Sequence, residues 1–174
     1  MFLARMVTRA KWEGRDGLAA AEIAADAVTG DLRTQRNALS FWECGAGTPD
    51  DVEDAALAIA AGRDDVAKIE VVWLADDDLI ADGQTLRNTE GRTPVTELVP
   101  RHVDVCQLDY VRLGTLARRV RRALEAERYL LLTRARVARI LAAAVTHGRV
   151  GLGDLEAKAQ VVVGRELEAT ADSD

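Results

Sequence analysis

Hydrophobic and polar residues alternate in the first segment of the chain, and two shorter apolar segments follow it. Residues 2–12 alternate throughout, whereas residues 38–44 and 67–74 are apolar stretches next to turn-forming residues. A period of two residues is typical of a half-buried strand, and a short apolar stretch is typical of a buried one. The pattern predicts three strands, each with one tryptophan (Trp12, Trp42, Trp73) that we expect to fill the core.

A helix is predicted between the second and third strands. Thr48 is a suitable N-cap, Pro49 follows at the first helical position, and Gly62 ends the apolar stretch. Acidic side chains in the first turn oppose the positive end of the helix dipole. We therefore expect a helix over 48–61, and the strand–helix–strand order predicts a parallel pair with a right-handed crossover.

Helical periodicity dominates the chain after residue 108. Apolar residues recur at helical spacing in three successive segments, 113–124, 130–145 and 152–167. Earlier in the chain we expect a turn at 13–17, short helices within 18–34 and a helical turn at 76–81. Between that helical turn and the helical part of the chain, glycine and proline residues interrupt the sequence (Gly83, Gly91, Pro94, Pro100), and we expect this segment to be irregular.

The predicted fold class is α+β: a small N-terminal sheet of about three strands with flanking helices, followed by a C-terminal three-helix unit. The expected division is an α+β subdomain (1–83), an irregular connection (84–107), a helical bundle (108–169) and a frayed tail (170–174), or one compact domain overall. A chain of 174 residues is long enough to bury a sizeable core.

Composition narrows the class of protein. The chain is 48% hydrophobic and 30% charged, which excludes a mostly disordered protein. No apolar stretch reaches the roughly 18 residues of a membrane helix, and the N-terminal segment lacks the apolar region of a signal peptide. Cys44 and Cys106 form neither a disulfide framework nor a zinc-binding spacing. We expect a cytoplasmic protein with no membrane partner.

Charge is divided unevenly along the chain. Residues 1–100 carry 10 basic and 19 acidic side chains, and residues 101–174 carry 13 basic and 10 acidic ones, which together give the net charge of −6. Within 110–149 ten arginines stand against two glutamates. This asymmetry predicts two electrostatically distinct surfaces, which meet each other, a partner protein or nucleic acid.

The arginines of the helical half are the candidate partner-binding residues. On a helical projection the arginines of 112–122 lie opposite the apolar stripe and on both its flanks, where they suit an acidic protein surface or a nucleic-acid backbone. The helix that would enter the DNA major groove in a helix-turn-helix is acidic here, which disfavours that motif, so we favour contact with a protein. The alternative is a solvated face of a bundle helix. The candidates are Arg112, Arg118, Arg119, Arg121, Arg122, Arg136 and Arg139.

Three other groups of residues are weaker candidates for a metal, catalytic or phosphate-binding site. Asp76, Asp77 and Asp78 follow the third predicted strand, and Glu43 lies near the end of the second. These carboxylates are weak candidates for Mg²⁺ or Mn²⁺, although consecutive aspartates more often form a capped, solvated turn. His102 and Cys106 would share one side of a helix, as a nucleophile with its base or as half a metal site. Gly45 and Gly47 precede a helix, but its acidic first turn would repel a phosphate.

The chain has no Walker loop, no dinucleotide-binding glycine motif and no nucleophile elbow, so we expect no cofactor and no catalytic residue. The sequence predicts a non-enzymatic interaction or regulatory module, such as an adaptor, immunity protein or antitoxin, whose partner is another protein or a second copy. The first alternative is a nucleic-acid-binding regulator using residues 112–139. The second is a Mg²⁺- or Mn²⁺-dependent phosphoryl-transfer enzyme at Asp76–Asp78.

Overall fold

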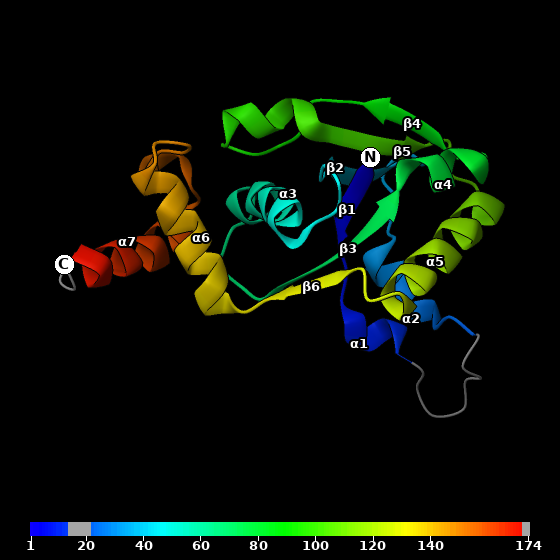
Figure 1. The fold of residues 1–174 in the computed structure, drawn as a ribbon, viewed down its shortest axis with the longest axis horizontal. Helices are drawn as coiled ribbons and strands as arrows, with labels where there is room; N and C mark the ends of the chain where they lie inside the picture. The colour runs from blue at the N-terminus through cyan, green and yellow to red at the C-terminus, as the bar shows by residue number, and fades with distance from the viewer. Residues whose placement is uncertain (14–21, 172–174) are drawn as a thin grey trace.

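A six-stranded antiparallel sheet forms the centre of the molecule in the computed structural model, which describes residues 1–13 and 22–171 (Figure 1). The strand order is β4-β5-β2-β1-β3-β6. The elements in chain order are β1 (Phe2–Met6), α1 (Arg9–Trp12), α2 (Ala25–Asp31), β2 (Leu39–Glu43), α3 (Pro49–Ala61), β3 (Ile69–Ala75), α4 (Asp76–Ala81), β4 (Thr85–Asn88), η1 (Thr96–Arg101), β5 (His102–Cys106), α5 (Tyr110–Glu125), β6 (Tyr129–Leu132), α6 (Arg134–Thr146), η2 (Leu152–Asp154) and α7 (Ala157–Ala171).

The fold is α+β, but the prediction of a three-stranded sheet followed by a three-helix unit is wrong. β4 and β5 lie in the segment 84–107, where glycine and proline obscured two short strands. β6 was read as the start of a helix, because Leu130 continues the apolar spacing of α6. Whether the chain divides into the predicted domains stays a prediction.

β1 occupies the middle of the predicted strand–helix–strand unit. It pairs antiparallel with β2 on one side and with β3 on the other, so β2 and β3 run in the same direction without being neighbours. The parallel direction of this pair was predicted correctly, and the insertion of β1 between the two strands was not. The carboxyl ends of β2 and β3 therefore lie at one edge of the sheet with the N-terminus of β1.

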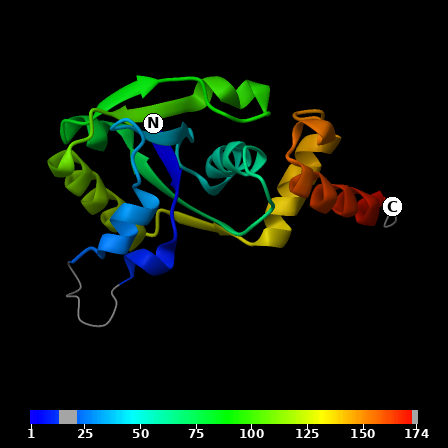
Figure 2. The ribbon, with the colours of Figure 1, turned by 180° about the vertical axis from the view of Figure 1, so that it is seen from behind.

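Helices cover both faces of the sheet and form two cores. Side chains of β3 alternate between them: Ile69, Val71 and Trp73 join one core, and Val72 and Leu74 join the other. The first core contains residues of α3, α6 and α7, and the second contains residues of α2, α4 and α5. α5 therefore packs on the opposite face from α6 and α7, which separates the three helices expected to form one unit (Figures 1 and 2).

The local signals around α3 are confirmed. Thr48 caps the helix in a capping box with Asp51, and Pro49 occupies the first turn. The brief helix at 76–81 is also present as α4. Most of the expected turn at 13–17, the start of the segment 18–34 and residues 172–174 of the expected tail lie outside the described residues.

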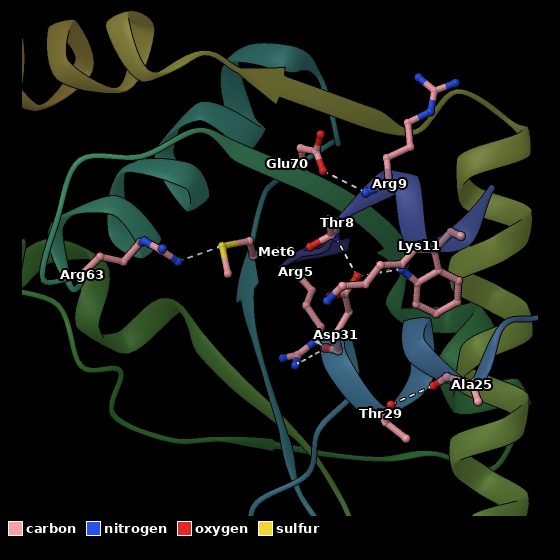
Figure 3. A network of polar contacts seen from close by, with 11 residues as sticks. Arg5, Met6, Thr8, Arg9, Lys11, Ala25, Thr29, Asp31, Arg63 and Glu70 are labelled. Carbon is pink, nitrogen blue, oxygen red and sulfur yellow. Dashed lines mark hydrogen bonds and ion pairs between the residues drawn. The ribbon is translucent and has the colours of Figure 1, made fainter. Parts of the chain in front are cut away.

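The predicted strand over 2–12 ends at Met6, because the following residues bond to Asp31 at the end of α2. The Asp31 carboxylate accepts hydrogen bonds from the Thr8 amide (2.6 Å), the Lys11 ammonium (2.9 Å) and the Trp12 indole (2.9 Å). The Arg5 guanidinium donates two bonds to the Asp31 carbonyl (Figure 3). Burial lowers the pKa of Arg5 to about 10, and Asp31 opposes that shift. These contacts turn the chain into α1.

The three tryptophans are buried, as expected, although only two lie in strands. Trp42 and Trp73 belong to the core beneath α3, and Trp12 belongs to the core on the other face as part of α1. Among the described helices, none combines the length and the apolar composition needed to cross a bilayer.

Candidate functional site

The predicted partner-binding arginines do not form one surface. Five of them lie on α5 and two, Arg136 and Arg139, lie on α6, which packs on the other face of the sheet. Arg119 is bidentate to Asp82 (2.5 and 2.8 Å), and this bond holds the pKa of Asp82 below its usual range. These two side chains connect α5 to the end of α4 and are part of the protein's own packing.

Three more of these arginines also bond within the molecule. Arg121 pairs with Glu125 one turn along α5 (2.8 Å) and donates to the Trp12 carbonyl. Arg136 pairs with Glu53 of α3 at 2.7 Å. Arg112 donates to the Gln107 carbonyl at 3.1 Å. Within the described part of the chain, Arg118, Arg122 and Arg139 are the remaining candidates, exposed and without an ion pair.

Acidic and basic segments of the sequence meet inside one molecule. Asp54 of α3 pairs with Arg149 at 2.9 Å and with Arg101 at 3.1 Å, and Glu97 pairs with Arg149 at 2.7 Å. These pairs connect α3 and η1 to the end of α6. Much of the charge asymmetry read from the sequence is therefore neutralised between elements of the same fold.

The acidic candidates for a metal do not converge. Asp76 pairs with the Met1 amino group at 2.9 Å, Asp78 lies 3.4 Å from Arg119, and Glu43 accepts a bond from Asn88. The described residues contain no group of three or more acidic, histidine or cysteine side chains that could hold an ion. Asp77 follows Asp76 in the first turn of α4.

His102 and Cys106 share a face, but on strand β5 and not on a helix. Because side chains alternate along a strand, Asp104 lies between them on the same face, while Val103 and Val105 enter the core on the other face. Four residues of strand span about 13 Å. That separation is too long for a nucleophile and its base.

This polar face of β5 lines a groove beside the end of α3. Two adjoining hollows of about 560 and 440 Å³ share Gln35, Ser40, Thr89, Arg92 and Asp104 in their walls. The larger one is also lined by Arg36, Arg87, Ala38, Cys106 and Gln107. We call this the arginine groove, after Arg36, Arg87 and Arg92. With Asp104 as its one acidic member, the lining of the larger hollow carries a net charge of +2 (three arginines less one aspartate) in a protein of net charge −6.

A chain of hydrogen bonds forms the floor of the arginine groove. Ser40 donates to one oxygen of Asp104 at 3.1 Å, and Thr89 donates to the other at 3.1 Å. Thr89 also lies 2.7 Å from His102 Nδ1. Because the single hydroxyl proton of Thr89 is donated to Asp104, the imidazole N–H is the donor in this second bond. Trp42 packs edge-on against His102, with ring centroids 5.0 Å apart. Burial lowers the pKa of His102, and Asp104 partly opposes that shift.

Among the described residues, the three arginines of the groove have no side-chain partner. Arg87 lies opposite Asp104 in the β4–β5 register, but both carboxylate oxygens of Asp104 already accept hydroxyl bonds. No ion pair or side-chain bond of Arg36, Arg87 or Arg92 occurs among the described residues. All three are exposed. Their guanidinium groups are therefore available to a ligand.

Backbone geometry at the rim is specialised. Gln35 and Ala38 pair across a tight turn whose central residues, Arg36 and Asn37, have φ of 54° and 59°. Gln107, whose neighbour Leu108 donates to the Asn37 carbonyl, has φ of 57°. Non-glycine residues with positive φ cost free energy and concentrate at functional sites. Three of the four non-glycine positive-φ residues described belong to this rim or adjoin it.

Glycine at position 91 brings the segment carrying Arg92 onto the floor. A Cβ at Gly91 would collide with the rings of Trp42 and with the His102 Cβ, and a Cβ at Gly62 would lie 2.5 Å from the Arg92 carbonyl. Both close approaches require glycine. They fix Arg92 at the edge of the groove, over the end of α3.

Sequence reasoning missed this site. The signal was present: polar His102, Asp104 and Cys106 alternate with valines, which is the period of a strand with one polar face. Pro100 concealed the strand. Comparison of the chain with protein-family models, with curated proteins and with solved structures finds no match.

Proposed function

We propose that the protein is a non-catalytic binding module that holds an acidic segment of a partner protein in the arginine groove. One observation carries the proposal: three exposed arginines that pair with no described side chain line a hollow of about 560 Å³. Arginine presents a planar fork of donors that matches a carboxylate in two-point contact.

The groove suits binding better than catalysis. The Ser40 and Thr89 hydroxyls share one acceptor, the Asp104 carboxylate, and Thr89 is also bonded to His102. The Cys106 thiol is buried, and its contact is the Asp104 carbonyl at 3.6 Å. A catalytic nucleophile is paired with a base that a third group orients. Here one carboxylate, Asp104, accepts from both hydroxyls, and the contact of Cys106 is a backbone carbonyl, so the arrangement favours binding.

A direct test uses fluorescence anisotropy of a fluorescein-labelled oligoglutamate peptide as the acidic probe. The variant Arg87→Glu with Arg92→Glu should weaken binding by about a hundredfold, or about 1.4 kcal/mol for each reversed contact. The matched control is Arg118→Glu with Arg122→Glu on α5, which changes the net charge equally but lies outside the groove. It should change affinity by less than about threefold.

Two results would contradict the proposal. Equal losses in both variants would show a non-specific response to net charge. A loss confined to the α5 variant would place the partner site on the exposed arginines of that helix. The same titration with a single-stranded oligonucleotide tests the nucleic-acid alternative. Tighter, steeply salt-dependent binding of the oligonucleotide that Arg118→Glu with Arg122→Glu abolishes would favour that alternative.

A further inference from the structure

The free edge of β4 adjoins the arginine groove. β4 is the last strand of the sheet, and no other described strand lies beyond it. Its backbone therefore has one side bonded to β5 and one side open. Arg87 and Asn88, in the second half of the strand, are both exposed.

The register shows which backbone groups point outward. The Thr89 amide donates to the carbonyl of His102, which lies opposite it when the β4–β5 register is continued by one residue. Hydrogen-bonded and non-hydrogen-bonded pairs alternate along an antiparallel ladder. Thr85 and Arg87 are therefore bonded to β5, whereas the N–H and C=O groups of Leu86 and Asn88 point away from it.

We infer that the acidic partner segment binds in extended form as a seventh strand along β4. This inference rests on the proposed function and assigns the conformation and the residue pattern of its ligand. Strand addition of this kind takes affinity from backbone hydrogen bonds and specificity from alternate side chains. The outward N–H and C=O groups of Leu86 and Asn88 supply the backbone hydrogen bonds, and the groove supplies the contacts for alternate side chains.

Alternation fixes the pattern of the segment. Thr85 and Arg87 project to the groove side of β4, since they lie opposite Cys106 and Asp104 of β5, and Leu86 packs against the core on the other face. An added strand would place every second side chain beside Arg87 and the intervening ones beside Leu86. Strands lie about 4.8 Å apart, so the acidic side chains would be next to Arg87 and about twice as far from Asp104. The fitting segment alternates acidic and apolar residues.

The test compares three labelled peptides by anisotropy: alternating Glu and Val, the same composition in blocks, and the alternating peptide N-methylated at every second residue. The alternating peptide should bind about tenfold more tightly than either of the others. Equal affinity of all three would overturn the strand inference while leaving acidic recognition intact. Failure of every peptide to bind would overturn the proposed function itself.

A substitution in the protein gives independent evidence. Asn88→Pro removes one outward N–H and leaves the bonds to β5, because proline is tolerated where the N–H of an edge strand faces solvent. The control Asn88→Ala removes the same side chain and keeps the N–H. Asn88→Pro should weaken the alternating peptide by about fivefold or more relative to Asn88→Ala. Equal affinities of the two variants, with unchanged circular dichroism, would overturn the inference.

Discussion

Removal of the Asp31 carboxylate should be among the most destabilising single changes in this protein. Asp31 is 9% exposed and Trp12 is 3% exposed, so the bond between them is shielded from water. The same carboxylate accepts the Thr8 amide at 2.6 Å and the Lys11 ammonium at 2.9 Å. Asp31→Ala removes all three acceptor contacts at once (Figure 3).

The magnitude follows from which donors can find water. Lys11 is 31% exposed and can be rehydrated, so its contribution is discounted to well under about 1 kcal/mol. The Thr8 amide and the Trp12 indole lose their partner, at about 1–3 kcal/mol each. Together these two losses lower the expected free energy of unfolding of Asp31→Ala by about 2–6 kcal/mol, a large share of a typical total of about 5–15 kcal/mol.

Urea denaturation at neutral pH, followed by tryptophan fluorescence, measures this loss. Lys11→Met is the matched control, because it removes the charge partner and leaves both buried donors bonded to Asp31; it should cost less than about 1 kcal/mol. Asp31→Asn keeps one carbonyl oxygen for the two buried donors and should fall between the two. A loss below about 1 kcal/mol for Asp31→Ala, at an unchanged denaturant slope, would refute the argument.

Three further predictions concern the groove and its supports. Gly91→Ala should lower the free energy of unfolding by about 1–3 kcal/mol in urea, because its methyl group would overlap Trp42 and His102. Because the folded-state pKa of His102 lies below its unfolded value, stability should fall as pH drops below about 6.5, and urea titrations should show this decline absent in His102→Asn. Arg119→Met should cost about 1–2 kcal/mol by losing its bidentate bond to Asp82, measured by thermal unfolding.

The sequence predicted correctly those elements that are determined by residues close together along the chain. α3 was predicted almost to the residue, because its cap, proline and acidic first turn act within a few residues of one another. The end of β1 was not predictable in this way. It depends on Asp31, which lies more than twenty residues away from Thr8 along the chain and reaches it only after α2 has packed.

The candidate site was missed for the same physical reason. The polar residues of the arginine groove come from the 35–38 turn, β2, β4, the 89–92 segment and β5, and only the pairing of those strands brings them together. Arginines on α5 were conspicuous in the sequence because they are clustered within one helix, but Arg119 and Arg121 bond to the protein itself. Ion pairing between distant elements cannot be read from spacing along one helix.

The most direct test of acidic recognition is a titration of ¹⁵N-labelled protein with the oligoglutamate peptide, followed by amide chemical shifts. The account predicts saturable shifts concentrated in residues 35–40, 85–92 and 102–107, which surround the arginine groove. Shifts concentrated around Arg118 and Arg122 of α5, with the groove unaffected, would contradict it.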